Sequence, residues 1–193
     1  VQSCTGGFMN ERKDIIRTRK AIWAAYLELS KEKSYAEITA SDIIKKAGVS
    51  RATFYGHYRD IHELREEIEN DFCSMSAEAL LPSVRSLFTN TEQACYNILL
   101  FFEKNSSMIC SVTASGTSDK FFHLCKTRMS SDILRCAFTG KINEESRLKC
   151  SMLASLLVDQ GREAAMDDSG IYSISFRARM LKEVIEKGIP SGR

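Results

Sequence analysis

One short stretch of the sequence, residues 47–58, holds most of the side chains whose types and spacing suit the binding of another molecule. It reads AGVSRATFYGHY. If its second half is helical, Phe54, Tyr58 and partly Tyr55 share one side of that helix and would be buried. The other side carries small and hydrogen-bonding residues: Ala52, Thr53, Gly56 and His57.

An α-helix fits the major groove of DNA, where arginine pairs with guanine edges and threonine bonds a base or contacts a thymine methyl group. Arg51 and Thr53 have the residue types that these contacts need. The small residues Ala52 and Gly56 would let the helix backbone come close to the partner. We therefore expect this helix to read a DNA sequence.

The residues around this helix predict the corner that would position it. Thr39 and Asp42 fit a capping box at the start of a short second helix. Gly48 can take the positive φ that ends this helix and turns the chain. Ser50 can then cap the third helix, and the whole pattern is that of a helix-turn-helix.

Apolar spacing predicts helices along the rest of the chain as well. The first covers Asp14 to about Lys33, and the fourth begins after Asp60, with Glu63 completing its cap, and continues to Pro82. Later helices are expected near residues 91–104, 119–138, 144–167 and 173–187. The predicted fold class is all-α, with an N-terminal three-helix helix-turn-helix domain followed by a C-terminal helical bundle.

The charge distribution separates the same two parts. Residues 10–65 hold 12 Lys and Arg against 8 Asp and Glu, whereas residues 66–193 hold 15 against 17. A basic module beside a slightly acidic remainder suggests that the first part faces a polyanion. We predict a disordered arm at residues 1–11, a DNA-binding domain at 12–64 and a ligand-sensing and dimerisation domain at 65–193.

The segments AIWAAYLEL and ITASDIIKKAGVSRATFYGHYRDIHEL resemble the DNA-binding domain of TetR/AcrR-type transcriptional regulators. The resemblance implies a homodimer that binds a palindromic double-stranded operator, and usually a repressor released by a small-molecule effector. The family commonly has a phosphate-contacting lysine where this chain has Ile61, so Arg59 is expected to supply that contact. The predicted DNA-contacting residues are Thr39, Ser41, Ser50, Arg51, Ala52, Thr53, Tyr55, Gly56, His57 and Arg59.

Two further sets of residues are predicted in the C-terminal part. An aromatic and thioether-rich set would form either the core alone or a small apolar effector pocket: Phe101, Phe102, Met108, Phe121, Phe122 and Met129. The last two helices carry apolar rows that would either close the domain or pack against a second copy, and the resemblance favours the dimer. The predicted interface residues are Met152, Leu153, Leu156, Leu157, Ala178, Leu181, Val184 and Ile185.

The sequence does not support catalysis. HELRE at residues 62–66 has Glu66 where a zinc protease motif needs its second histidine, and His123 and Cys125 would diverge on a helix. We therefore expect no enzyme activity, cofactor or metal. Because the chain shows no signal peptide and no apolar run long enough to cross a membrane, we expect no membrane partner and a cytoplasmic location.

Two alternatives to an effector-controlled regulator stay open. The seven cysteines are scattered and odd in number, which suits reduced, buried thiols, but one or two of them could instead sense oxidants. The second alternative is a helical interaction protein whose DNA contacts have decayed, which Ile61 makes conceivable.

Overall fold

The computed structural model describes residues 6–113, 118–138, 142–167 and 169–187. Every regular element within these ranges is a helix, which confirms the predicted all-α class. The chain divides into two compact units, residues 1–70 and 71–193. Each unit is described by itself below.

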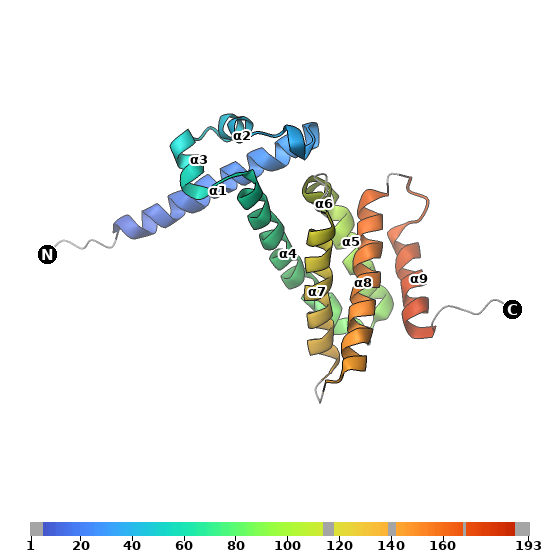
Figure 1. Ribbon diagram of the computed structural model, residues 1–193. Coiled ribbons are helices and arrows are strands. Elements are labelled where there is room, and N and C mark those ends of the chain that lie inside the picture. The colour runs from blue at the N-terminus through green and yellow to red at the C-terminus, as the bar shows by residue number, and fades with distance from the viewer. Residues whose placement is uncertain (1–5, 114–117, 139–141, 168, 188–193) are drawn as a thin grey trace. The chain divides into compact units, whose positions relative to one another are not determined.

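The N-terminal unit is a small helical domain built on one long helix (Figure 1). Its elements are α1 (Gly6–Glu32), the short 3₁₀ helix η1 (Tyr35–Glu37), α2 (Ala40–Ala47), α3 (Arg51–His57) and the beginning of α4 (Ile61–Ser86). Its core consists of fully buried apolar side chains from these helices: Ile22, Tyr26, Ile43, Phe54 and Leu64. Because α1 and α4 supply part of that core, α2 and α3 are held against a common apolar base.

Three boundaries differ from the sequence-based prediction. Residues 1–5 of the predicted arm lie outside the described residues, but residues 6–11 belong to α1. The two units meet after Asn70 rather than after residue 64, because α4 begins in the first unit and continues into the second. Pro82 does not end α4, which extends to Ser86.

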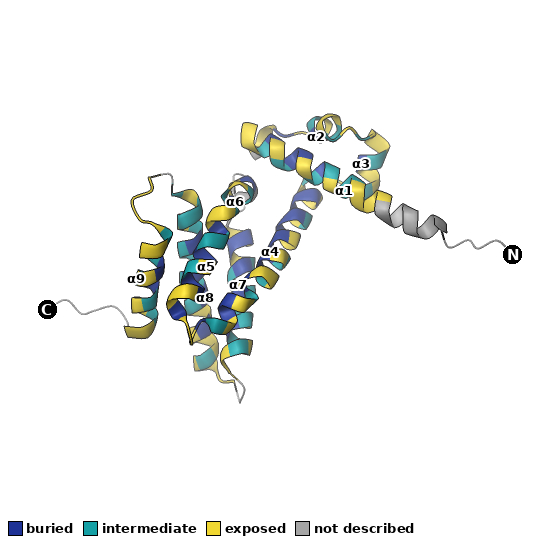
Figure 2. Ribbon diagram, turned by 180° about the vertical axis from the view of Figure 1, so that it is seen from behind, coloured by how far each residue is buried: buried dark blue, intermediate teal, exposed yellow. Residues whose placement is uncertain are grey.

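The C-terminal unit is a helical bundle in which α5, α7, α8 and α9 run alongside one another (Figure 1). Together with the remainder of α4 it contains α5 (Thr91–Lys104), α6 (Ser106–Thr113), α7 (Ser118–Ala137), α8 (Glu144–Met166) and α9 (Ile174–Lys187). Helix α8 packs against α5 and α7, and α5 also packs against α9. Buried residues accordingly line the inward sides of these helices (Figure 2).

One close approach shapes this bundle. Gly161 on α8 faces the ring of Phe102 on α5, and an added Cβ would lie 2.5 Å from Phe102 Cδ2 and 2.6 Å from its Cγ. Only a residue without a side chain lets the two helices pack this tightly.

The helices predicted after residue 90 are confirmed within a residue at each end. Helix α6 was not predicted, because its sequence SSMICSVT is rich in serine and carries no clear apolar period. Most of the predicted break TASGTSD lies outside the described residues.

Candidate nucleic-acid interface

The corner between α2 and α3 has the predicted geometry. The Thr39 hydroxyl accepts a hydrogen bond from the Asp42 amide at 3.2 Å, and the Asp42 carboxylate accepts one from the Thr39 amide at 2.9 Å. This reciprocal box confirms the predicted start of α2. Gly48 ends the helix in the left-handed region, with φ of 65°, where residues with a Cβ are strained.

Ser50 fixes the first turn of α3. Its hydroxyl oxygen accepts a hydrogen bond from the Thr53 amide at 3.0 Å, and the Ser50 and Thr53 hydroxyl oxygens are 2.7 Å apart. A hydroxyl has one donor and two acceptor positions, so both groups keep bonding capacity for an outside partner. The cap thus places the Ser50 and Thr53 hydroxyl groups at the N-terminal end of α3, directly after the Gly48 turn.

Helix α3 divides into a buried and an exposed side, as its sequence predicted, except that Tyr55, expected partly on the buried side, is 47% exposed. Phe54 and Tyr58 are only 0% and 2% exposed. Thr53 and His57 are half-buried at the boundary. The exposed residues are Arg51, Ala52, Tyr55 and Gly56. A Cβ added at Gly56 would have no atom within 4 Å, so nothing in this unit covers that turn of the helix.

Cationic and aromatic groups lie together on this exposed side. The guanidinium carbon of Arg51 is 6.0 Å from the centre of the Tyr55 ring, and the ring face attracts the cation. Arg59 follows α3, and its side chain is 83% exposed. Its Nε forms an ion pair with Oδ2 of Asp60 at 3.6 Å. An ion pair so exposed holds its partners weakly, so Arg59 can turn to a phosphate.

Trp23 and Arg19, two side chains of α1 that the sequence did not assign to the site, connect α1 to the end of α3 and to α4. The Trp23 indole N–H donates a hydrogen bond of 2.9 Å to the Tyr58 hydroxyl, across 35 residues of sequence. Arg19 lies 5.7 Å from the Trp23 ring and forms an ion pair with Glu67 on α4. The available signal was Trp23 on the apolar row of α1, which indicates burial but no specific partner.

A groove beside α3 contains Ile61, the departure from the family pattern. Its lining comes from η1, α2, α3 and α4: Ala36, Ile38, Ala40, Tyr55, Arg59, Asp60, Ile61 and His62. The Ile61 side chain has no hydrogen-bond donor, whereas the Tyr55 hydroxyl and the Arg59 guanidinium, which also line the groove, can both donate.

The acidic residues of the site serve as helix caps. Hydrogen bonds from the Thr39 amide and hydroxyl lower the pKa of Asp42. The amide of Glu63 lowers the pKa of Asp60, and nearby Arg59 adds to this. The predicted box at Asp60 is only half present, because the Glu63 carboxylate accepts from the Arg59 amide instead, at 2.6 Å.

Comparison with known proteins places this unit. Residues 22–68 match the model for bacterial regulatory proteins of the tetR family. This part of the chain is thus similar to the DNA-binding domain of TetR-family regulators. It is 43% identical over 61 residues to YxbF of Bacillus subtilis (strain 168), an uncharacterised HTH-type transcriptional regulator, and this match spans 31% of the chain and 16% of YxbF.

A second relative is the dhaKLM operon transcriptional activator DhaS of Lactococcus lactis subsp. lactis (strain IL1403), 39% identical over 69 residues. This match covers 35% of the chain and 36% of DhaS. The chain thus aligns with well under half the length of either relative, and the sequence likeness concerns the DNA-binding part of the TetR fold.

Two solved structures extend the likeness in fold to the C-terminal unit. A TetR transcriptional regulator from Streptococcus agalactiae 2603V matches with a TM-score of 0.59 at 22% identity, covering 91% of this chain and 99% of its own. The dihydroxyacetone kinase operon activator DhaS matches with a TM-score of 0.63 at 16% identity, covering 87% and 93%. At these identities the likeness shows that the TetR fold is shared.

The predicted pocket residues lie in the interior of the C-terminal unit. Phe102, Phe121, Phe122 and Met129 are buried, and Phe101 and Met108 are half-buried. The Phe72 ring stacks on both Phe101 and Phe121, at 6.3 and 5.8 Å. Phe102 and Met129 border a cavity of about 20 Å³, which holds about one water molecule. The aromatic residues therefore fill the space between these helices.

The predicted interface residues divide by burial. Leu157, Ala178 and Leu181 are at most 4% exposed within the single chain. Their burial within one copy fits the alternative in which these apolar rows close the domain, and the dimer interface stays a prediction. Met152 is 64% and Val184 38% exposed, and the other three, Leu153, Leu156 and Ile185, are half-buried.

Within the described ranges, no three His, Cys, Asp or Glu residues are grouped so that they could hold a metal ion. None of the helices searched there has the length and apolar character needed to cross a membrane.

Proposed function

We propose that this protein is a TetR-family, sequence-specific, DNA-binding transcriptional regulator in which α3 enters the major groove of its operator. The observation that carries the proposal is the exposed side of α3, where Arg51 lies against the Tyr55 ring. The helix that presents this side begins at the Ser50 cap, directly after the left-handed turn at Gly48. Helices presented by such a corner insert their N-terminal residues among base edges.

The residues divide by the contact each would make. Arg51 and Thr53 would reach base edges, and Ala52 and Gly56 would allow close approach of the backbone. The remaining members of the set would hold phosphates from the two ends of the corner: Thr39, Ser41, Ser50, Tyr55, His57 and Arg59.

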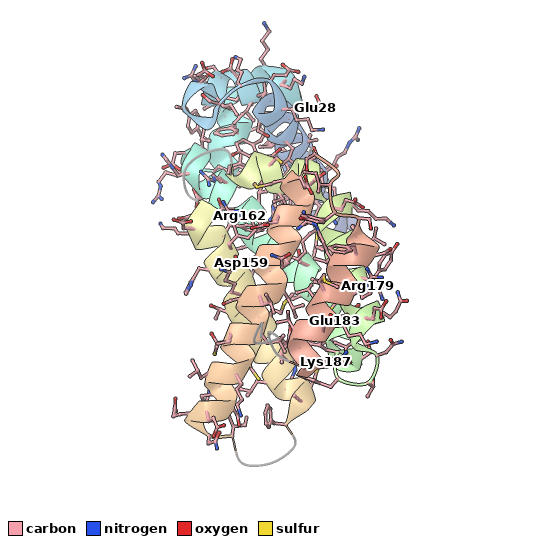
Figure 3. All side chains as sticks on the ribbon, turned by 90° about the vertical axis from the view of Figure 1, so that its right-hand side faces the viewer. Glu28, Asp159, Arg162, Arg179, Glu183 and Lys187 are labelled. Carbon is pink, nitrogen blue, oxygen red and sulfur yellow. The ribbon has the colours of Figure 1, made fainter. Side chains whose placement is uncertain are left out.

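The functional unit would be a homodimer formed through α8 and α9. A groove between these helices is lined by large apolar side chains, several of them exposed, including Met166, Tyr172, Phe176 and Val184. Arg179, Glu183 and Lys187 follow one another along α9 and border its apolar row (Figure 3). An apolar surface rimmed by alternating charge is typical of a protein interface. Two copies would present two α3 helices to a palindromic operator.

Repression released by an effector is the proposed mode of action. Because the aromatic interior leaves only a water-sized cavity, a larger apolar effector would have to widen it and tilt α4. Such a ligand shifts the DNA-binding equilibrium only if it binds the open and closed forms differently. Activation is the second candidate, because the relative DhaS is named an activator.

Selection of bound duplexes from a random DNA pool by the purified protein tests the proposal. We expect enrichment of a palindrome whose half-sites are about one helical turn apart, roughly 34 to 36 Å. Transcription from a promoter carrying that palindrome, with and without the protein, then decides between repression and activation.

The double variant Arg51→Ala, Thr53→Ala shows whether the enrichment depends on α3. Neither residue belongs to the core of the unit, so the variant should keep its fold. It should fold like the wild type and enrich no sequence. A pool that stays random at low salt while the wild type remains dimeric would reject DNA reading in favour of an interaction protein.

A further inference from the structure

Two cysteines from distant parts of the sequence meet inside the C-terminal unit. The sulfur atoms of Cys73 on α4 and Cys125 on α7 are 3.6 Å apart, although 52 residues separate them. Both side chains are buried, at 2% and 8% exposed. A disulfide needs its sulfur atoms about 2.05 Å apart, so the two thiols are neighbours that are not yet bonded.

The surroundings of this pair differ from those of other buried thiols in the bundle. Burial raises the pKa of Cys95 to about 12, and it also raises the pKa of Cys150, so both thiols stay protonated. In contrast, the hydrogen bond from Cys125 lowers the pKa of Cys73, and the positive charge of Arg128 lowers it further. The thiolate is the reactive form of cysteine, so Cys73 is the better nucleophile.

Small molecules have a place beside the two sulfur atoms. Cys73, Cys125 and Arg128 all line the cavity of about 20 Å³. This volume admits about one water molecule, which suits a small oxidant and excludes a drug-sized ligand. Arg128 is anchored there by a hydrogen bond of 2.6 Å from its Nη1 to the Ser74 hydroxyl.

From this arrangement we propose that Cys73 and Cys125 are a peroxide-sensitive thiol pair, which closes to a disulfide between α4 and α7 and lowers the affinity for DNA. The Cys73 thiolate attacks hydrogen peroxide, which breaks the O–O bond and gives a sulfenic acid and hydroxide. The hydroxide takes up the proton that the Cys73 thiol released and becomes the first water. The Cys125 thiol then attacks the Cys73 sulfur, which forms the S–S bond and releases the second water. The two thiols are oxidised and the peroxide is reduced.

The regulatory part rests on the proposed DNA-binding function. Helix α4 is continuous from Ile61 to Ser86, so Cys73 shares one helix with the residue that follows the α3 corner. Disulfide formation brings the sulfur atoms about 1.5 Å closer, and we expect the bond to fix α4 against α7 and to shift the two helices. We expect the operator affinity to fall about tenfold, within the range usual for coupled sites.

The test treats the purified full-length chain with hydrogen peroxide and measures two things separately. Digestion and mass spectrometry should show the Cys73 and Cys125 peptides linked, with the loss of two hydrogen atoms. Operator affinity should fall with the same dose dependence and return after dithiothreitol. Cys73→Ser and Cys125→Ser should abolish both responses, and Cys73→Ala replaces the serine variant if the buried hydroxyl impairs folding. Cys110→Ser, at an exposed cysteine, should keep both.

The two readouts distinguish the failures. Absence of the linked peptides in the wild type would overturn the thiol pair, whatever the DNA data show. Linked peptides with unchanged operator affinity would overturn its regulatory role. A reduced protein that binds no operator would reject the proposed function, while the linked peptides would still establish the pair.

Discussion

Arg51 and Arg59 are exposed cations at opposite ends of α3, and they should contribute differently to DNA binding. Arg51 opens the helix on its exposed side, whereas Arg59 follows the buried Tyr58 that caps its end. We expect Arg51→Ala to weaken binding to the selected operator roughly 5- to 100-fold and to relax the preference at one base pair. Binding to random DNA should change much less, as titrations of both duplexes would show.

Arg59→Ala should instead weaken binding to all duplexes alike. The plot of log K against log salt should become less steep by about 0.9, the value of one neutralised phosphate. Arg85→Ala, at an exposed position in the last turn of α4, is the control and should change neither quantity. An unchanged salt slope would remove Arg59 from the phosphate contacts and leave the Ile61 departure uncompensated.

The bond between Trp23 and Tyr58 should be measurable in the stability of the N-terminal unit. It is partly buried and connects α1 to the end of α3. Tyr58→Phe and Trp23→Phe should each destabilise the protein, and the double-variant cycle should give a coupling of about 0.5 to 1.5 kcal/mol. Thermal unfolding of the four proteins supplies the cycle. Additive effects would mean that the hydrogen bond between the two side chains contributes no net stability.

Helix α2 has only eight residues, so its stability depends strongly on its caps. Because the amide and hydroxyl of Thr39 hold the pKa of Asp42 below its ordinary value, ionised Asp42 stabilises the folded state. That stabilisation is present above an unfolded pKa of about 4 and is lost as the pH falls through the lower folded value. Asp42→Asn should therefore be less stable than the wild type at pH 7, and the difference should shrink toward pH 2.

Chemical denaturation at several pH values would check this, with Asp14→Asn as the control. Asp14 is an exposed carboxylate of the same unit. If the deficit of Asp42→Asn stayed constant down to pH 2, the cap would not depend on ionisation. Thr39→Ala, which removes the other half of the box, should cost about 1 kcal/mol.

In the bundle, the packing of α8 on α5 depends on one position. Gly161→Ala would place its Cβ 2.5 Å from the Phe102 ring, and the rigid ring cannot swing away as a flexible side chain would. We expect a loss of about 1 to 3 kcal/mol in the free energy of unfolding. Adding Phe102→Leu should recover part of it, because the smaller side chain makes room. If Gly161→Ala unfolded like the wild type, the two helices would not be in such close contact.

Local patterns predicted most of the elements, because caps, glycine turns and apolar periods lie within a few residues of one another. Thr39, Gly48 and Ser50 each act on their immediate neighbours, and all three are confirmed in these roles. The predicted end of α4 at Pro82 was wrong, since the helix continues to Ser86 and the buried Ser83 and Val84 hold the turn after the proline in the interior of the unit. Helix α6 is likewise stabilised by packing rather than by a sequence period.

At the scale of the whole molecule, the features that sequence reasoning missed are contacts between distant residues. Trp23 with Tyr58 and Cys73 with Cys125 depend on how helices pack, which no spacing along the chain encodes. The same limit explains the interface prediction. A periodic apolar row marks a buried side of a helix, but it does not tell whether the chain or a second copy buries it. Both alternatives were therefore open for Leu157 and Ala178, which are buried within the single chain.

The exposed apolar side chains of α8 and α9 provide the test of assembly. Phe176 stacks on Tyr172 with ring centres 5.2 Å apart, and Phe176 and Val184 both line the groove. A carboxylate buried between two copies would lack a partner, so Phe176→Glu with Val184→Glu should give monomers in light scattering. Affinity for the full palindrome should then drop to that of the wild type for a single half-site, because the second reading helix is lost. Ser175→Glu adds the same charge at an exposed polar position of α9 and should leave the dimer intact. A doubly substituted protein that remains dimeric and binds the palindrome fully would place the interface elsewhere.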